Sequence, residues 1–366
     1  MKKTEKEFCV DRHRILLSRL EAHDIDAFLI TKIENVRYLS GFGGSSAYII
    51  FYKNKPTLIT DFRYKIQAEE EVCGLDIVIK KGSGIDVVVE VIKDLSGIRR
   101  IGFESRHLVF EDYIKLKESL EGISLISLRH AIEGMRAIKD KGEIEKIRTA
   151  VKRAEGIYPV IKELVTEGAV ESEVSAMLEY EVRKSGSRRI PFEFIVASGF
   201  RGALPHAPSS RKKIKEGDAV ICDWGAEADG YFSDITRALF IGNTGDKMQN
   251  IYDIVLYAQQ ETIKAIKPGI SVSELDSVAR NIITEANLGE YFGHGTGHGI
   301  GLSVHESPII KQSTDSTLNT QHSTLLKGMV FTVEPGVYVP GLGGVRIEDM
   351  VLVTEDGCEV LTSLPK

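Results

Sequence analysis

Short apolar runs alternate with amphipathic segments over the first part of the chain. The amphipathic stretch at residues 7–23 predicts a helix. The runs that predict strands are DAFLIT, AYIIFY, KPTLITD, DIVIK, RRIGFE and ISLISL. Segments of helical periodicity lie among them at residues 64–72, 85–94 and 110–120. Interleaved helices and strands predict an α/β layer arrangement.

The pattern changes at residues 129–141, where the strand-like runs stop and a long charged helical segment begins. We therefore predict two domains, residues 1–130 and 131–366. Two domains are also what 366 residues would ordinarily form, and the 42% hydrophobic content is enough to bury substantial cores.

The second domain reads as an internal repeat. Two helical segments, 141–167 and 171–184, precede the run FEFIVAS and the stretch ICDWGAEADGYFSDITR. Two more, 246–266 and 273–286, precede a His-rich stretch and the pair MVFTVEPGVYV and VRIEDMVLV. Two similar halves that face each other would bring their acidic hairpins together.

Each predicted hairpin carries carboxylates inside apolar strand patterns. Asp223 follows Ala-Val-Ile-Cys and Asp234 precedes Ile-Thr-Arg-Ala-Leu-Phe, so a paired hairpin can place both on one face. In the second half Glu334 lies in TVEPG and Glu348 in RIED, with Arg346 predicted to share the face of Glu348. Isolated buried acids are costly, so this arrangement calls for cations.

The electrostatics of four converging carboxylates support that interpretation. Like charges at about 4 Å repel by roughly 4 kcal/mol at an effective dielectric constant near 20. Two divalent ions would neutralise all four. Any one of these acids alone is more simply explained as an ordinary surface or paired residue, but four on paired hairpins are not.

A histidine-rich stretch, GHGTGHGIGLSVHE, separates the two acidic regions. It contains His294, His298 and His305, and His206 lies upstream in LPHAP. The spacing of the first two suits a zinc-binding helix, but the intervening glycines disfavour a helix and HExxH is absent. We predict a Gly-rich loop that lets the backbone approach a ligand, and the histidines indicate a functional site.

Composition narrows the classes of partner. A net charge of −6 gives no electrostatic footprint for nucleic acid or an anionic membrane, and the basic residues 211–215 read as a solvated loop. No apolar run approaches membrane-spanning length, and no export signal is evident. The four cysteines show no CxxC spacing and predict reduced thiols in a cytoplasmic protein. The sequence GFGGSS at 41–46 lacks the GK[ST] ending of a phosphate loop and predicts a turn.

Over nearly its whole length the chain resembles the pita-bread metallopeptidases, specifically the Xaa-Pro peptidases (aminopeptidase P and prolidase). The resemblance rests on DWGAEADGYFSDITR, HGTGHGIGLSVHE, TVEPGVY and GVRIED. NVRYLSGF and TDFRY resemble the N-terminal domain of the same family. The implied fold is a creatinase-like α/β domain followed by a pita-bread domain with a pseudo-twofold repeat.

The resemblance also implies a ligand set. Asp223 would serve one metal, Asp234 and Glu348 would bridge both, and His298 and Glu334 would complete the other. Glu334 would also move a proton to the leaving nitrogen.

Further side chains would bind the substrate or support the site. Those that the resemblance implies are His206, His294, His305, Tyr338 and Arg346. His206 and His305 would act in catalysis by donating hydrogen bonds, His206, His305 and Tyr338 would surround the proline ring, and Arg346 would support the carboxylate cluster.

The donor set favours two divalent ions per subunit. Four carboxylates and one imidazole suit Mn²⁺, with Co²⁺, Fe²⁺ or Zn²⁺ as alternatives. The substrate would be a peptide with proline at its second position, cleaved by an Xaa-Pro aminopeptidase or alternatively by an Xaa-Pro dipeptidase (prolidase). The family further implies a homodimer.

Three other functions are consistent with parts of the sequence. A metal-free, creatinase-like hydrolase or a non-catalytic binding module should have lost metal ligands, whereas this chain retains all five. A methionine aminopeptidase would not need the first 130 residues. The sequence leaves open whether dipeptides or longer peptides are preferred.

Overall fold

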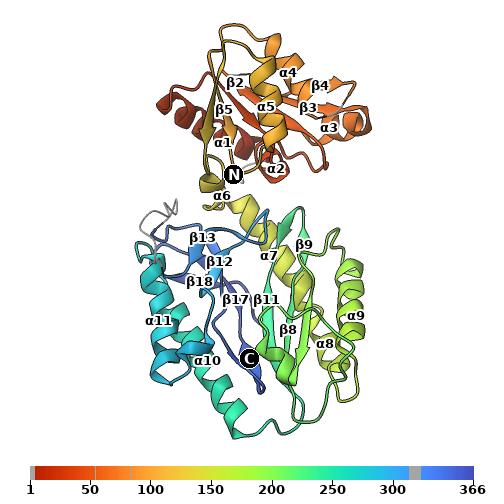
Figure 1. Ribbon diagram of the computed structural model, residues 1–366, viewed down its shortest axis with the longest axis vertical. Helices are drawn as coiled ribbons and strands as arrows, with labels where there is room; N and C mark the ends of the chain where they lie inside the picture. Colours follow the sequence, from red (N-terminus) through yellow and green to blue (C-terminus); the bar gives the residue numbers. More distant parts are fainter. Residues whose placement is uncertain (1–4, 54, 83, 313–322) are drawn as a thin grey trace. The chain divides into compact units, whose positions relative to one another are not determined.

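The computed structural model describes residues 5–53, 55–82, 84–312 and 323–366. These residues form two compact units, Met1–Arg136 and Ala137–Lys366 (Figure 1). The division falls six residues after the end of the domain predicted as 1–130. None of the described helices is both long enough and apolar enough to cross a membrane.

The first unit is built on one mixed sheet in the order β4-β3-β2-β1-β5-β6. Its strands are β1 (Ala27–Ile30), β2 (Tyr48–Tyr52), β3 (Thr57–Asp61), β4 (Asp76–Lys80), β5 (Arg100–Glu104) and β6 (Ser124–Leu128). The β1–β2 and β2–β3 pairs are antiparallel and the other neighbours are parallel. Each strand coincides with a predicted apolar run.

Helices cover both faces of this sheet. They are α1 (Glu5–Ala22), α2 (Ile33–Ser40), α3 (Lys65–Glu71), α4 (Ile85–Lys93), α5 (Phe110–Ser119) and α6 (Glu133–Arg136), with a 3-10 turn η1 (Phe62–Tyr64). Alternate strand residues such as Leu29 and Ile50 pack against α4 and α5. The GFGGSS stretch is a loop between α2 and β2, so a strand follows it and the predicted turn is confirmed.

The cysteines of the first unit correct one prediction. Cys9 and Cys73 form a disulfide, so the expectation of reduced thiols is wrong for this pair. Cys222 and Cys358 are free thiols, and burial raises the pKa of Cys222 to about 12. The sequence could not reveal the pair, because 64 residues separate its members. The cytoplasmic location stays a prediction.

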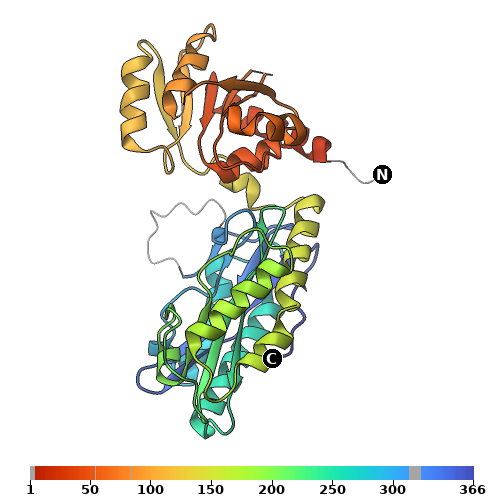
Figure 2. The same cartoon turned by 90° about the vertical axis from the view of Figure 1, so that its right-hand side faces the viewer.

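The first half of the second unit packs three helices against a three-stranded antiparallel sheet, ordered β11-β8-β7. The elements are α7 (Lys141–Glu155), α8 (Tyr158–Leu164), α9 (Glu171–Lys184), β7 (Ile195–Ser198), η2 (Gly199–Ala203), β8 (Ala219–Trp224), β9 (Glu227–Ala228), β10 (Tyr231–Phe232) and β11 (Ile235–Phe240). The helix predicted over 141–167 is two helices, separated at Gly156 and Ile157. Figure 2 shows α9 on the outside of this half.

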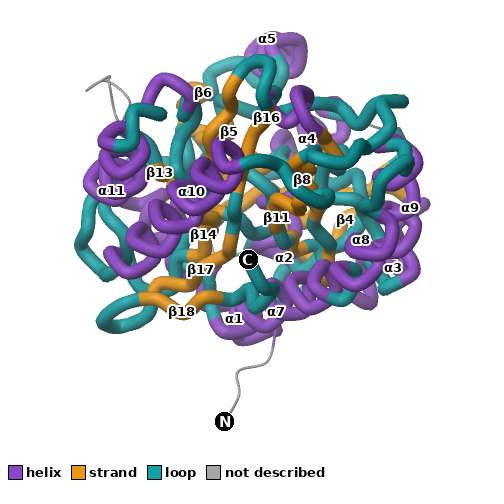
Figure 3. The backbone as a smooth tube through the Cα atoms, turned by 90° about the horizontal axis from the view of Figure 1, so that it is seen from below, coloured by secondary structure: helices purple, strands orange, loops and turns teal. Residues whose placement is uncertain are grey.

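The second half repeats this plan with α10 (Asp246–Ala265) and α11 (Val272–Glu285). Its other elements are η3 (Gly289–Tyr291), β12 (Gly297–Gly299), β13 (Glu306–Ile310), β14 (Val330–Val333), β15 (Gly336–Val339), β16 (Gly343–Arg346), β17 (Asp349–Val353) and β18 (Cys358–Val360). The strands form a five-stranded sheet, β13-β12-β14-β17-β18, and the pair β15-β16. Viewed along the unit, α7, α8 and α9 lie on one side of the strands and α10 and α11 on the other (Figure 3).

The hairpins differ in one respect from the continuous pairs that the sequence predicts. The predicted strand MVFTVEPGVYV is divided into β14 and β15, and VRIEDMVLV is divided between β16 and β17. Because β14 pairs with β17 and β15 pairs with β16, the two breaks lie opposite each other. Glu334 and Glu348 occupy these interruptions. In the first half Asp234 likewise lies immediately before β11, while Asp223 lies inside β8.

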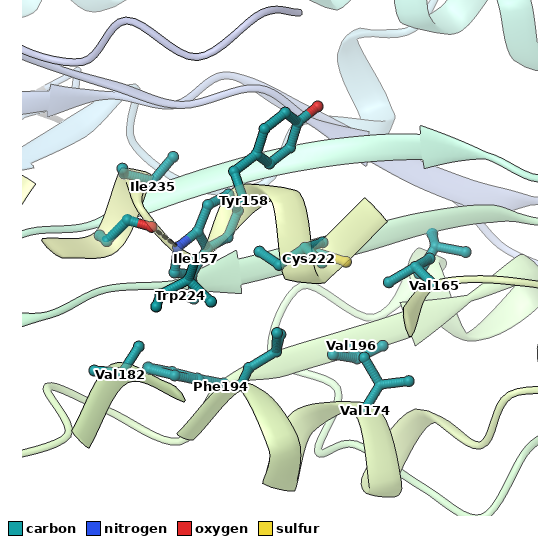
Figure 4. Packing of buried hydrophobic residues seen from close by; sticks show 14 of the residues in the cluster. Ile157, Tyr158, Val165, Val174, Val182, Phe194, Val196, Cys222, Trp224 and Ile235 are labelled. Carbon is teal, nitrogen blue, oxygen red and sulfur yellow. Dashed lines mark hydrogen bonds between the residues drawn. The ribbon is translucent and has the colours of Figure 1, made fainter. Parts of the chain in front are cut away.

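The core of the first half fixes β8 through Trp224, which is completely buried. Its indole nitrogen donates a hydrogen bond of 2.9 Å to the carbonyl oxygen of Ala154 at the end of α7 (Figure 4). Its ring stacks on Tyr158 at 6.2 Å between centroids. Because strand side chains alternate, Cys222 and Trp224 face the helices while Asp223 faces away from them.

Replacing this tryptophan should weaken the second unit. Trp224→Phe leaves the buried Ala154 carbonyl without its donor and removes ring volume, so we expect a loss of roughly 2 kcal/mol or more in unfolding free energy. Urea denaturation followed by circular dichroism measures the effect, since Trp224 is the sole tryptophan and the variant lacks a fluorescence signal. An unchanged unfolding midpoint would show that the hydrogen bond and stacking contribute little.

Candidate metal centre

Three side chains from different segments form the tightest group of ligand-type atoms in the described part of the chain. Asp234, His298 and Glu348 each offer one such atom, and these atoms lie within 4.8 Å of one another. Asp234 precedes β11, His298 lies in β12, and Glu348 lies between β16 and β17. The repeat therefore brings its two acidic regions together around one histidine.

The other two predicted ligands adjoin this group. Nε2 of His298 is 3.3 Å from Oε1 of Glu334 and 3.7 Å from Oδ2 of Asp234. Asp223 lines the same cavity as Asp234, and its charge, after burial and the charge of Glu348, raises the pKa of the Asp234 carboxyl. All five residues whose types matched the expected ligands thus occupy one buried region, although their roles toward a metal stay predictions.

The electrostatics of this region fit a cation. Burial raises the pKa of Asp234 and Glu348 well above the ordinary carboxyl values, and neighbouring carboxylates raise both further. Burial also raises the pKa of Glu334. One oxygen of Asp223 and one of Asp234, both Oδ1, are buried without a hydrogen-bond donor among the described residues. Divalent cations would satisfy these oxygens and compensate the repulsion, so the donor set fits a metal centre.

The ring of His298 is oriented for metal binding. Its Nδ1 lies 3.1 Å from the carbonyl oxygen of Gly299, so Nδ1–H donates there and the lone pair of Nε2 faces the carboxylates. Burial lowers the pKa of His298, which favours the neutral imidazole. A neutral imidazole with an oriented Nε2 lone pair is the form in which histidine binds metals.

Arg346 connects the carboxylates to the wall behind them. Its Nη2 donates to Oδ2 of Asp223 at 2.6 Å, and its Nε donates to the hydroxyl of Thr236 at 3.1 Å. That hydroxyl donates in turn to Oε2 of Glu348 at 2.6 Å. Arg346 therefore orients two carboxylates, one directly and one through Thr236, as a support for the cluster requires.

The glycines around His298 have a different role from the one predicted. Gly297 and Gly299 belong to strand β12, which lies between β13 and β14, and not to a ligand-binding loop. A Cβ on Gly297 would collide with the Thr332 carbonyl, and one on Gly299 with that of Ser307. The glycines thus let three backbones pack closely around the histidine, and the loop prediction was wrong here.

The cluster lies in the wall of a cavity of about 390 Å³. His206, His294, His305 and Arg346 also line it, as do all five predicted ligands. The ring centroid of His305 is 4.1 Å from that of His298, and burial followed by the proximity of His298 lowers the pKa of His305. A neutral His305 next to the cluster can donate a hydrogen bond to a substrate atom.

Tyr338 is the predicted substrate residue that the structure places elsewhere. Tyr338 is not one of the described residues that line the cavity. Its hydroxyl accepts a hydrogen bond from Nη1 of Arg346 at 3.0 Å and bonds Nε2 of His294 at 2.8 Å. Tyr338 is buried behind the cavity wall and holds Arg346 and His294 in place, so the prediction that it surrounds the proline ring is not supported by its position.

Several cavity residues escaped the sequence reasoning, namely Phe192, Glu193, Ile309 and Lys311. Phe192 and Glu193 lie just before β7, at the start of the apolar run FEFIVAS. In the sequence they look like ordinary residues at the end of a strand. Ile309 and Lys311 come after the histidine motif and are two residues apart. Such a spacing indicates one face of an extended segment, but this signal can be used only once β13 is known to be a strand.

Comparisons with known proteins agree with this geometry. Residues 145–355 match the model of metallopeptidase family M24, and residues 12–138 match the creatinase/prolidase N-terminal domain. An Xaa-Pro dipeptidase of Pyrococcus horikoshii is 39% identical over 350 residues, which are 95% of each protein.

Solved structures of similar proteins extend over almost the whole chain. An Xaa-Pro dipeptidase from Bacillus anthracis has a TM-score of 0.92 and 41% identity, covering 98% of both chains. An X-Pro aminopeptidase from Thermotoga maritima has a TM-score of 0.84 and 40% identity, covering 95% of this chain and 98% of the other. A protein named as a dipeptidase and a protein named as an aminopeptidase therefore share this fold, and both are similarly identical in sequence to this chain.

Proposed function

Because the chain belongs to metallopeptidase family M24, we propose that it is an exopeptidase that hydrolyses the bond between an N-terminal residue and proline, with dipeptides as its preferred substrates. The observation that carries this proposal is the buried cluster of four carboxylates and one imidazole in the wall of the cavity. Relatives named Xaa-Pro dipeptidase support a dipeptidase more strongly than the Xaa-Pro aminopeptidase that the sequence predicts.

The proposed site holds two divalent ions. Asp223 would bind one ion, Asp234 and Glu348 would bind both, and His298 and Glu334 would complete the second. We retain Mn²⁺ as the proposed metal, because the donor set is mostly oxygen, with Co²⁺, Fe²⁺ or Zn²⁺ as alternatives. A homodimer in the cytoplasm remains part of the proposal.

The chemistry divides between the ions and the chain. Bound divalent ions make a water nucleophilic at neutral pH and stabilise negative charge on a carbonyl oxygen. Glu334 accepts the proton that this water releases and passes it to the ring nitrogen as the carbon–nitrogen bond breaks. The products are a free amino acid with a new carboxylate and a proline with a protonated amine, so atoms and charge balance.

The histidines supply hydrogen bonds. His206 and His305 line the cavity beside the cluster, where they would donate to the substrate carbonyl oxygen as charge develops on it. Arg346 is not a substrate ligand in this scheme, since its guanidinium is committed to Asp223, Thr236 and Tyr338.

A small peptide panel tests the function. Purified protein supplied with Mn²⁺ should release alanine from Ala-Pro faster than from Ala-Pro-Ala, and should leave Ala-Ala nearly uncleaved. Faster release from Ala-Pro-Ala would favour the aminopeptidase reading. Equal cleavage of Ala-Pro and Ala-Ala would defeat the assignment to proline.

Loss of either histidine should slow the chemical step. We expect His305→Ala and His206→Ala each to lower kcat by roughly 10²-fold, a typical cost for one transition-state donor. Metal content should stay the same, because neither residue is a proposed ligand. His23→Ala, at an exposed position outside the second unit, is the control. Unchanged kcat in both cavity variants would remove these histidines from the mechanism.

A further inference from the structure

Lys311, the residue immediately after strand β13, lines the cavity. Ile309 and Lys311 line the cavity, whereas Ile310 between them is completely buried in the core. This is the alternation expected along a strand. Ile309 pairs with His298 of β12, so Lys311 lies two residues beyond the level of a proposed metal ligand.

Within the described residues, the ammonium group of Lys311 has no partner. No side chain in the described ranges forms an ion pair or hydrogen bond with it, and the residue is exposed. Arg346 is the other lysine or arginine that lines the cavity among the described residues, and its donors are engaged by Asp223, Thr236, Tyr338 and the carbonyl of Pro205. Lys311 is therefore the described lysine or arginine of this wall whose charge is available to a ligand.

Gly295 leaves room for the lysine stem. A Cβ built on Gly295 would lie 3.0 Å from Cβ of Lys311 and 2.7 Å from the carbonyl oxygen of Ile310. Any other residue at 295 would have to displace the start of the Lys311 side chain or the end of β13. The glycine thus permits the close approach of the backbone at residue 295 to Lys311, and both residues line the cavity.

An Xaa-Pro dipeptide presents a group that needs such a cation. Its terminal carboxylate carbon is three bonds from the scissile carbonyl carbon, roughly 4 Å along the chain. Two divalent ions would neutralise the four carboxylates of the cluster, but Glu193 would remain as a further negative charge in the wall. A substrate carboxylate would be repelled there unless a positive charge compensated it.

We propose that Lys311 binds the terminal carboxylate of the dipeptide and so selects dipeptides over longer peptides. This assignment rests on the proposed Xaa-Pro peptidase function. Lys311 is two residues beyond Ile309, at most roughly 7 Å of extended chain, and its side chain spans roughly 6 Å, so its ammonium can reach a carboxylate located beside the proposed reaction centre.

Matched substrates with and without the charge test the assignment. Lys311→Met should raise KM for Ala-Pro about 10-fold and change kcat little. A change of about 10-fold is at the lower end of what loss of a hydrogen bond to a charged group costs, because the lysine is exposed to solvent. KM for the uncharged Ala-Pro-amide should stay the same. Lys311→Arg should retain the preference for Ala-Pro, and Lys311→Glu should reverse it. Lys247→Met, on the exposed side of α10, is the control for loss of a positive charge.

The possible failures are distinguishable. Equal changes for Ala-Pro and Ala-Pro-amide in Lys311→Met, or no change for either, would overturn the role of Lys311 while leaving the peptidase assignment intact. Cleavage of neither compound by the parent protein would overturn the proposed function and this assignment with it.

Discussion

Removing metal with a strong chelator is expected to abolish peptidase activity and lower thermal stability, and adding Mn²⁺ or Co²⁺ to restore both. Without cations, Asp223, Asp234, Glu334 and Glu348 form a largely buried cluster whose members repel one another. A metal that binds only the folded chain stabilises it in proportion to the logarithm of its concentration over Kd. Peptide hydrolysis and a thermal melt, before and after dialysis against chelator, measure the two effects.

The pH dependence of the metal-free protein follows from the same cluster. The pKa values of Asp234 and Glu348 are raised in the folded chain, so folding favours their protonated forms. Their favourable contribution is fully present below the ordinary carboxyl pKa and is lost as pH rises toward the raised values. The chelated protein should therefore lose more stability, relative to the metal-loaded protein, at pH 8 than at pH 5.

Full activity after verified metal removal would contradict the metal-dependent mechanism and support the creatinase-like, metal-free alternative.

The second large effect is expected from Asp234→Ala and from Glu348→Ala. Each removes a carboxylate proposed to bind both ions, so each variant should lose at least one ion per subunit and nearly all turnover. The fold should survive, because removing one acid also relieves repulsion within the cluster. Elemental analysis of the purified variants, together with circular dichroism, separates loss of metal from loss of structure.

Glu193→Ala is the matched control for those variants. Glu193 lines the same cavity but is not a proposed ligand, so this variant should keep both ions. Two ions still bound in Asp234→Ala would show that the ligand assignment is wrong.

Sequence reasoning predicted most elements because their patterns are local. The strands of the first unit follow from short apolar runs, and α9 begins and ends where the helical pattern does. The break between α7 and α8 was missed because the helical periodicity continues through Gly156. β12 was missed because its glycines are needed only for contacts with β13 and β14, which the linear pattern cannot express.

The sequence likewise predicts part of the site: the types of the proposed metal ligands, but not every residue of the cavity wall. The ligand types could be recognised because acids inside apolar strands, next to clustered histidines, are unusual. Tyr338 lies behind the cavity wall, which the sequence does not reveal, because a position in a motif does not say which side of a wall a ring occupies. Lys311 was missed because an exposed lysine at the end of a strand is ordinary until its neighbours are known.

The alternation along β13 separates two kinds of evolutionary constraint. Ile310 faces the core, where most replacements would cost stability, so selection for folding restrains it. Ile309 and Lys311 face the cavity, where replacements alter contacts with substrate but disturb little packing. On the proposed role of Lys311, a lineage can therefore change its preferred peptide length by substitutions at the end of β13 while its proposed ion-binding residues stay the same. Such a division of constraints would produce a protein named as a dipeptidase and a protein named as an aminopeptidase that share this fold and are each about 40% identical to this chain.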